Sequence, residues 1–199
     1  MSNYDPTTAP IPGKEPMLLL DTTGSMNYGT SATSKTPRRV TIQEAISILV
    51  ETLAREDSEA EHEEGGGGLR TVTFANGQAH DLEDLNPRNL REKWASIVWD
   101  GGTLIMPGWN KLLQVYAEEF GDRPVSQRPK LLALIITDGE ARDFQTFAKA
   151  IRQSAGNIYV ALTIIGYGEE HERTLAAYQD AAEQNPAHVQ VYSFGSQTD

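Results

Sequence analysis

The sequence predicts an α/β protein built on one mostly parallel β-sheet with helices on both faces. Three nearly continuous apolar runs are typical of strands buried on both sides: residues 17–20, 131–136 and 158–165. Helical patterns lie between these runs. Strands that alternate with helices of such lengths form βαβ units, in which the strands are parallel. The chain has 199 residues, which suits a single domain with a sizeable buried core.

Weaker patterns complete the predicted sheet and its helices. Residues 70–74 and 189–194 alternate partly between apolar and polar side chains, as half-buried strands do. Residues 75–83 can supply one antiparallel edge strand. The predicted helices cover residues 37–55, 87–94, 112–120, 144–151 and 170–183.

The predicted folded domain spans residues 15–195. Residues 1–14 contain several prolines among small polar side chains, which predicts a flexible leader, and residues 196–199 are left as a short C-terminal tail. Residues 56–68 are acidic and end in a run of glycines, which indicates a mobile surface loop. These glycines do not form a phosphate-binding loop, because no Gly-Lys-Ser/Thr sequence follows them.

Charge and composition exclude several classes of function. The chain carries 17 basic and 28 acidic residues, a formal net charge of −11. Such a surface repels nucleic-acid phosphates and anionic lipids, so we expect no nucleic acid and no membrane as partners. No stretch reaches the roughly 18 apolar residues of a membrane span, and the N-terminus lacks a signal-peptide pattern. The absence of cysteine excludes disulfides and thiolate metal sites, and it agrees with a cytoplasmic location, which we expect.

Oxygen-bearing side chains gather where the first predicted strand ends. Asp21, Thr23 and Ser25 follow residues 17–20 at alternate positions. Alternate side chains of extended backbone point to the same side, so these three can converge. Gly24 permits the tight backbone that this convergence requires. Ligands of open α/β sheets bind beyond the carboxyl ends of the strands, which is where these oxygens lie.

Two further oxygen-bearing side chains are expected at the same end of the sheet. Asp138 follows the strand at 131–136, and Thr103 lies in a glycine-containing loop before a helix. The resulting set of two carboxylates and three hydroxyls selects Mg²⁺, Mn²⁺ or Ca²⁺ over zinc or copper. Because few of these ligands are charged, a cation held by them keeps its affinity for an anion from outside. We therefore predict one divalent cation, Mg²⁺ with Mn²⁺ or Ca²⁺ as alternatives.

These motifs resemble those of von Willebrand factor type A (vWA) domains that carry a metal-ion-dependent adhesion site (MIDAS). That family has D-x-S-x-S after the first strand, a threonine in a distant glycine-containing loop, and an aspartate in a T-D-G turn after the fourth strand. Here Asp21–Ser25 matches the first motif with Thr23 in place of the first serine. Gly101–Thr103 and Thr137–Gly139 match the other two. The resemblance covers about residues 15–195.

The resemblance implies a doubly wound, Rossmann-like three-layer sandwich with six strands in the order 3-2-1-4-5-6 and the third strand antiparallel. It also implies that a carboxylate from a partner protein completes the coordination of the bound cation. Members of the family that lie inside cells often serve as assembly modules, so a place in a larger assembly is expected. The metal ligands implied are Asp21, Thr23, Ser25, Thr103 and Asp138.

Other residues near these motifs have simpler interpretations. Glu140 and Asp143 precede a predicted helix, where acidic residues interact favourably with the helix dipole, although both are also candidates to extend the site. Asp100 stays open as a further candidate. The tryptophans are interpreted as core or loop-packing residues and the histidines as surface residues: Trp94, Trp99 and Trp109; His62, His80, His171 and His188.

Two other functions remain as alternatives to metal-dependent binding. One is a metal-independent scaffold, and the other is a metal-assisted hydrolase, for which Glu140 is the candidate base. A phosphatase of the D-x-D type is excluded because Thr23 stands where that chemistry needs its second aspartate. A serine hydrolase is excluded because Ser25 lacks the G-x-S-x-G frame. We therefore expect a binding protein and not an enzyme.

Overall fold

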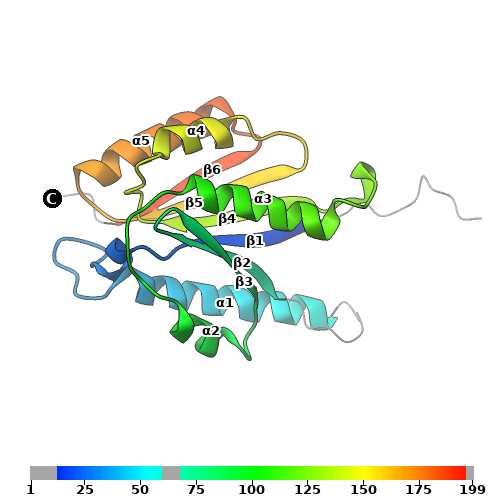
Figure 1. Ribbon diagram of the computed structural model, residues 1–199, viewed down its shortest axis with the longest axis horizontal. Helices are drawn as coiled ribbons and strands as arrows, with labels where there is room; N and C mark the ends of the chain where they lie inside the picture. The colour runs from blue at the N-terminus through cyan, green and yellow to red at the C-terminus, as the bar shows by residue number, and fades with distance from the viewer. Residues whose placement is uncertain (1–12, 60–67, 196–199) are drawn as a thin grey trace, which may run out of the picture.

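The computed structural model describes residues 13–59 and 68–195 (Figure 1). Six strands form one sheet in the order β3-β2-β1-β4-β5-β6. All neighbouring strands are parallel except β2 and β3, which are antiparallel. The predicted strand order and the antiparallel third strand are confirmed. The strands are β1 (Lys14–Asp21), β2 (Leu69–Ala75), β3 (Gln78–Leu85), β4 (Lys130–Thr137), β5 (Ile158–Ile165) and β6 (Val189–Phe194).

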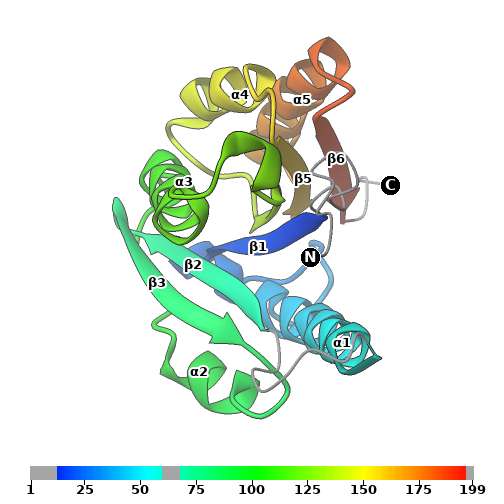
Figure 2. The same ribbon diagram turned by 90° about the vertical axis from the view of Figure 1, so that its right-hand side faces the viewer.

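Helices cover both faces of the sheet (Figure 2). On one face, α3, α4 and α5 pack against Leu19, Ile135 and Leu162. On the other face, α1 and α2 pack against Leu18 and Leu20. Because neighbouring residues of β1 enter two different cores, residues 17–20 of this strand are all apolar. No described helix is long and apolar enough to span a membrane. The helices are α1 (Arg38–Glu59), α2 (Leu90–Ser96), α3 (Met106–Phe120), α4 (Phe144–Arg152) and α5 (Glu169–Gln184), with short 3-10 helices η2 (Gly24–Asn27) and η3 (Val125–Gln127).

The last strand is packed on one face only in the part of the chain that the structure describes. Val189 of β6 is 2% exposed and belongs to the core beneath α5. Tyr192 and Phe194 point to the opposite face and are 53% and 52% exposed. No described residue of β6 joins the core on the side of α1 and α2.

The hairpin of β2 and β3 turns at Asn76 and Gly77. Their φ angles are 52° and 72°, and the tightest two-residue hairpin turns require positive φ at both positions. The predicted antiparallel strand at 75–83 is confirmed, although β3 begins only at Gln78, because the turn takes the two residues before it. The turn brings Asn76 to the carboxyl edge of the sheet, where β2 ends.

The predicted helices are present, and α1 is longer than expected. It continues to Glu59, so the loop predicted from residue 56 begins later. Residues 55–59 contain no glycine or proline that would end a helix. The rest of that loop, residues 60–67 with His62, lies outside the described residues, as do residues 1–12 and 196–199 of the predicted leader and tail.

Candidate metal centre

The site lies where the two central strands of the sheet end. β1 and β4 are parallel neighbours, and Leu20 pairs with Ile136 in their register. Asp21 and Asp138 therefore emerge at the same edge, since parallel strands place their carboxyl ends together. Both aspartates are 0% exposed.

Thr23 is the centre of a cluster of side-chain oxygens. Its Oγ1 donates a hydrogen bond to Oδ1 of Asp21 at 2.6 Å and lies 3.2 Å from Oγ of Ser25. It also accepts a hydrogen bond from Oγ1 of Thr103 at 3.2 Å. The structure thus brings four of the five candidate ligands together around one oxygen atom.

Backbone turns hold this cluster in place. The N–H of Thr23 donates to Oδ1 of Asp21 at 2.9 Å. The N–H of Gly24 donates to the carbonyl of Gly101 at 3.1 Å. A Cβ at Gly24 would lie 3.6 Å from Gly101, which is an ordinary contact. A side chain would therefore fit at this position, so the tight backbone that Gly24 was expected to permit does not depend on glycine.

Gly101 is the glycine that the site requires. Its φ is +86°, and a Cβ there would lie 2.0 Å from Oδ1 of Asn76. Asn76 holds the loop by two hydrogen bonds: its Oδ1 accepts the N–H of Gly102 at 3.0 Å, and its own N–H donates to the Gly102 carbonyl at 2.9 Å. Because Thr103 follows directly, Asn76 positions this hydroxyl. Asn76 was not among the predicted site residues, although an Asn-Gly pair between two strand patterns is a recognised turn signal.

Burial dominates the electrostatics of Asp21. Loss of water around its carboxyl raises the pKa of Asp21 to about 7, and the charge of Asp138 also raises it. Hydrogen bonds from Thr23 and Thr137 act in the opposite direction. The Thr137 hydroxyl donates to Oδ2 of Asp21 at 2.7 Å. A cation at this edge of the sheet would relieve the repulsion between the two carboxylates.

Asp138 is held by Arg38, which the sequence analysis had not singled out. Nη1 of Arg38 lies 3.0 Å from Oδ2 of Asp138. The other oxygen, Oδ1, accepts the N–H of Glu140 at 3.1 Å. Among the hydrogen bonds of the described residues, none joins the Asp138 carboxylate directly to the oxygens around Thr23. Within these described contacts, Asp138 acts on the cluster through its charge, which raises the pKa of Asp21.

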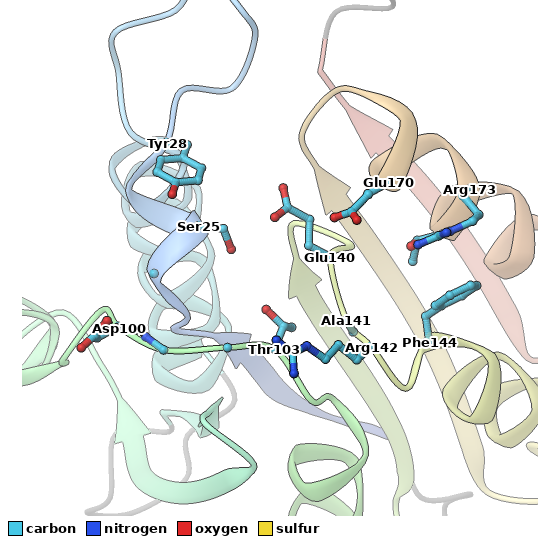
Figure 3. A pocket seen from close by; sticks show the side chains of 14 residues that line it. Ser25, Tyr28, Asp100, Thr103, Glu140, Ala141, Arg142, Phe144, Glu170 and Arg173 are labelled. Atoms are coloured by element: carbon cyan, nitrogen blue, oxygen red, sulfur yellow. Dashed lines mark hydrogen bonds between the residues drawn. The ribbon is translucent and has the colours of Figure 1, made fainter.

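A pocket of about 720 Å³ opens at the site (Figure 3). Ser25 and Thr103 line it, whereas Asp21, Thr23 and Asp138 are buried beneath its surface. A ligand from solvent would therefore meet these two hydroxyls first. The charged residues around the opening are Asp100, Glu140, Arg142, Glu170 and Arg173.

The other acidic candidates have different surroundings. Asp143 directly precedes α4, as predicted, but its carboxylate makes no capping hydrogen bond there; it accepts two backbone N–H groups at the start of α3 instead, both at 2.9 Å. Glu140 lies outside the first turn of α4, which begins at Phe144, and is 3.4 Å from Nη1 of Arg38, so the helix-start interpretation is wrong for this residue. Burial, followed by the charge of Asp138, raises the pKa of Glu140. Asp100 is exposed at the pocket and accepts the N–H of the next residue at 2.7 Å.

His171 is buried, contrary to the prediction that the histidines lie at the surface. It is 5% exposed, and its Nδ1 lies 3.3 Å from the carbonyl oxygen of Asp138. Burial lowers the pKa of His171. The tryptophans pack as predicted: Trp94 and Trp109 are buried, and Trp99 lies against Trp94 with ring centroids 5.2 Å apart.

The oxygen set is suited to a hard divalent cation. The separations between joined side-chain oxygens, 2.6 to 3.2 Å, are close to the edge of an Mg²⁺ octahedron, about 2.9 Å for bonds of about 2.05 Å. No group of three or more His, Cys, Asp or Glu within the described residues could hold a metal ion. Hydroxyl oxygens must therefore supply part of any metal site at this edge.

The strand order, the helices on both faces and the oxygen cluster at the carboxyl edge define a Rossmann-like sandwich of the vWA type. No protein-family model and no curated protein matches the chain. Solved structures do match, and several of them are vWA domains.

One similar structure is the VWA domain of SpRpn10, with 11% identity and a TM-score of 0.54 over 94% of this chain and 90% of that chain. A von Willebrand factor type A protein from Catenulispora acidiphila has 20% identity and a TM-score of 0.54, over 94% of this chain and 39% of that one. The PilB minor pilin from Streptococcus sanguinis has 14% identity and a TM-score of 0.61, over 94% of this chain. This chain spans 59% of the length of that pilin. These likenesses establish the fold.

Proposed function

We propose that this chain is a divalent-cation-dependent protein-binding module. Mg²⁺ is the expected cation, with Mn²⁺ or Ca²⁺ as alternatives, and a carboxylate of a partner protein would complete its coordination. The observation that best supports this proposal is the cluster of three hydroxyls around Thr23, joined to the buried carboxylate of Asp21. The residues that would hold the cation are Asp21, Thr23, Ser25, Thr103 and Asp138.

The position of the hydroxyls explains why the partner would bring an acidic group. Ser25 and Thr103 line the pocket while the two carboxylates stay buried. A bound cation would supply an electrophilic centre for an oxygen ligand from outside. Neutral hydroxyls do not cancel the charge of that centre, so an external carboxylate adds both a ligand and the missing charge. The charged residues around the opening include three acidic ones beside Arg142 and Arg173, so the bound cation would have to supply the attraction for an acidic partner.

Binding is favoured over catalysis by the surroundings of Glu140. A general base must be free to take a proton from a reacting group. The Glu140 carboxylate instead lies 3.4 Å from the Arg38 guanidinium, so an ion pair engages an oxygen that would have to take the proton. A binding module of this kind would suit a component of a larger assembly. One of the similar structures is, by its name, a minor pilin.

A metal-independent scaffold is the second candidate, and one observation favours it. Arg38 pairs with Asp138, and the hydroxyls of Thr23 and Thr137 donate to Asp21. Every buried charge of the site therefore has a partner within the chain. Under this alternative the partner protein would bind equally well with and without a chelator.

Calorimetric titration of chelator-treated protein with Mg²⁺, Mn²⁺ and Ca²⁺ separates these candidates. We expect one binding site in the wild type that is lost in Asp21→Ala and Asp138→Ala. The matched control, Asp100→Asn, removes an exposed carboxylate at the pocket and should bind normally. Each titration is repeated with excess acetate, which replaces the partner carboxylate. Folded wild-type protein that binds no cation in either series would exclude metal dependence and favour the scaffold.

A further inference from the structure

Arg38, the first residue of α1, extends its side chain to the site. Its Nη1 lies 3.0 Å from Oδ2 of Asp138 and 3.4 Å from Oε1 of Glu140. Nη1 also donates to the carbonyl of Ser25 at 3.4 Å, and Nε donates to the carbonyl of Gly29 at 3.2 Å. The guanidinium therefore connects the segment that follows β1 with the segment that follows β4.

The charge of Arg38 is both buried and permanent. Arg38 is 2% exposed, and it is the only buried lysine or arginine among the described residues. A guanidinium does not lose its proton in proteins. Burial of such a charge costs free energy that a single ion pair does not always offset. Because this charge stays in the buried site, it changes the electrostatic potential at any ligand that binds next to Arg38.

A count of charges shows the direction of this change. With Asp21 and Asp138 ionised, Arg38 leaves the buried site with one net negative charge, and a divalent cation would turn this into one net positive charge. Without Arg38 the same count gives two negative charges, and neutrality once a divalent cation is bound. Glu140 shifts all four values equally, so the difference of one charge remains. A positively charged site holds its cation less tightly and attracts an anion more strongly than a neutral one.

We therefore propose that Arg38 sets the ligand preference of this site: its charge weakens the binding of the cation and strengthens the binding of the partner's carboxylate. The inference rests on the proposed function, because it concerns the same cation and the same partner group. Arg38 is a positioning residue, since it contacts Asp138 and not the ligand. A purely structural role makes the opposite prediction for the cation, because loss of a residue that orients Asp138 would weaken cation binding.

Mn²⁺ affinities of the wild type, R38M and R38Q test the first half of the proposal. We expect both variants to bind Mn²⁺ at least roughly tenfold more tightly, since removal of a unit charge a few ångströms away changes affinity by about that factor or more at an effective dielectric constant of about 20. R39Q is the matched control. Arg39 is the next residue of α1 and carries the same charge, but its Nε donates to Asn27 at 2.8 Å. R39Q should stay within about twofold of the wild type, because Arg39 is only partly buried and solvent screens its charge.

Acetate titration of the Mn²⁺-loaded proteins tests the second half. Electron paramagnetic resonance of Mn²⁺ reports the change of its ligands as acetate is added. We expect the apparent acetate affinity to fall roughly tenfold in R38M and R38Q, by the same charge difference, and to be unchanged in R39Q. Circular dichroism establishes whether each variant is folded. If R38M does not fold, R38Q still provides the test, because its side-chain amide keeps two hydrogen-bond donors.

The outcomes separate this inference from the proposed function. Folded R38M and R38Q that bind Mn²⁺ as weakly as the wild type, or more weakly, would overturn the inference and leave the function in place. Tighter Mn²⁺ binding with unchanged acetate binding would also overturn it. If the wild type binds no Mn²⁺ but R38Q does, the charge effect is supported and the metal-dependent function fails. If neither folded protein binds Mn²⁺, both proposals fail.

Discussion

Replacement of Asp21 by asparagine tests the electrostatics of the buried site. Burial raises the pKa of Asp21 to about 7, whereas an aspartate in an unfolded chain has a pKa of about 3.9. The metal-free folded protein therefore binds this proton more tightly than the unfolded chain does. The stability that the protonated Asp21 contributes is complete below about pH 4 and is lost as the pH rises to about 7. Asparagine in this position does not titrate, so Asp21→Asn should remove this pH dependence.

The size of the effect follows from the gap between the two pKa values. One pKa unit corresponds to about 1.4 kcal/mol. Between about pH 5 and pH 7 the free energy of unfolding of the wild type should therefore fall by about 2 kcal/mol relative to Asp21→Asn. In a domain of this size the same difference is roughly 4 to 8 °C in Tm. His171 acts in the opposite direction because burial lowers its pKa, but it is present in both proteins and cancels in the comparison.

Urea unfolding followed by circular dichroism, in chelator-containing buffers from about pH 5 to pH 8, measures this difference. We expect the stability of Asp21→Asn to rise relative to the wild type as the pH increases. Asp100→Asn, which removes an exposed carboxylate, should follow the wild-type profile. Parallel profiles for the wild type and Asp21→Asn would show that Asp21 titrates like an ordinary carboxyl and would refute the reasoning.

Three further predictions concern the loop, the core and the cation. Asn76→Ala removes the acceptor of the Gly102 N–H and leaves alanine at positive φ, so we expect a loss of about 1–3 kcal/mol in unfolding free energy and weaker Mn²⁺ binding in calorimetry. Leu162→Ala, at a fully buried position, should cost about 2–5 kcal/mol in urea unfolding. Phe194→Ala should cost much less, because Phe194 is 52% exposed. The increase in Tm caused by Mg²⁺ should grow from about pH 6 to pH 8, because cation binding requires ionised Asp21.

Each of these predictions can fail in a defined way. Unchanged Mn²⁺ affinity in Asn76→Ala, compared with the exposed control His80→Ala, would show that the loop holds Thr103 without Asn76. Equal losses in Leu162→Ala and Phe194→Ala would contradict the one-sided packing of β6. A Mg²⁺-dependent Tm shift that does not change with pH would mean that Asp21 is already ionised at about pH 6.

The sheet was predictable because its central strands are buried on both faces. Such strands need apolar side chains at every position, and residues 17–20 show this pattern without knowledge of their neighbours. The place of the oxygen cluster was predictable for a similar reason, since the ends of parallel strands meet at one edge. Alternation then brought Asp21, Thr23 and Ser25 to one side.

The features that were missed depend on contacts between distant segments. Arg38 and Asp138 are 100 residues apart, and neither segment carries a local signal for their ion pair. The burial of His171 depends on how α5 packs against the segment after β4, which helical periodicity does not reveal. Asn76 had a local turn signal, but its hydrogen bond with Gly102 joins residues that are 26 positions apart and therefore depends on the tertiary fold.

The separation of the site's residues along the chain determines when the site can form. The hydrogen bond between Thr23 and Thr103 closes 80 residues, and the one between Asp21 and Thr137 closes 116. The entropy of closing such long loops must be overcome before the oxygens meet, so the site cannot nucleate folding. A cation that binds only the completed arrangement slows unfolding and leaves the folding rate unchanged. The concentration of the cation would then set the lifetime of the folded state and not the rate of folding.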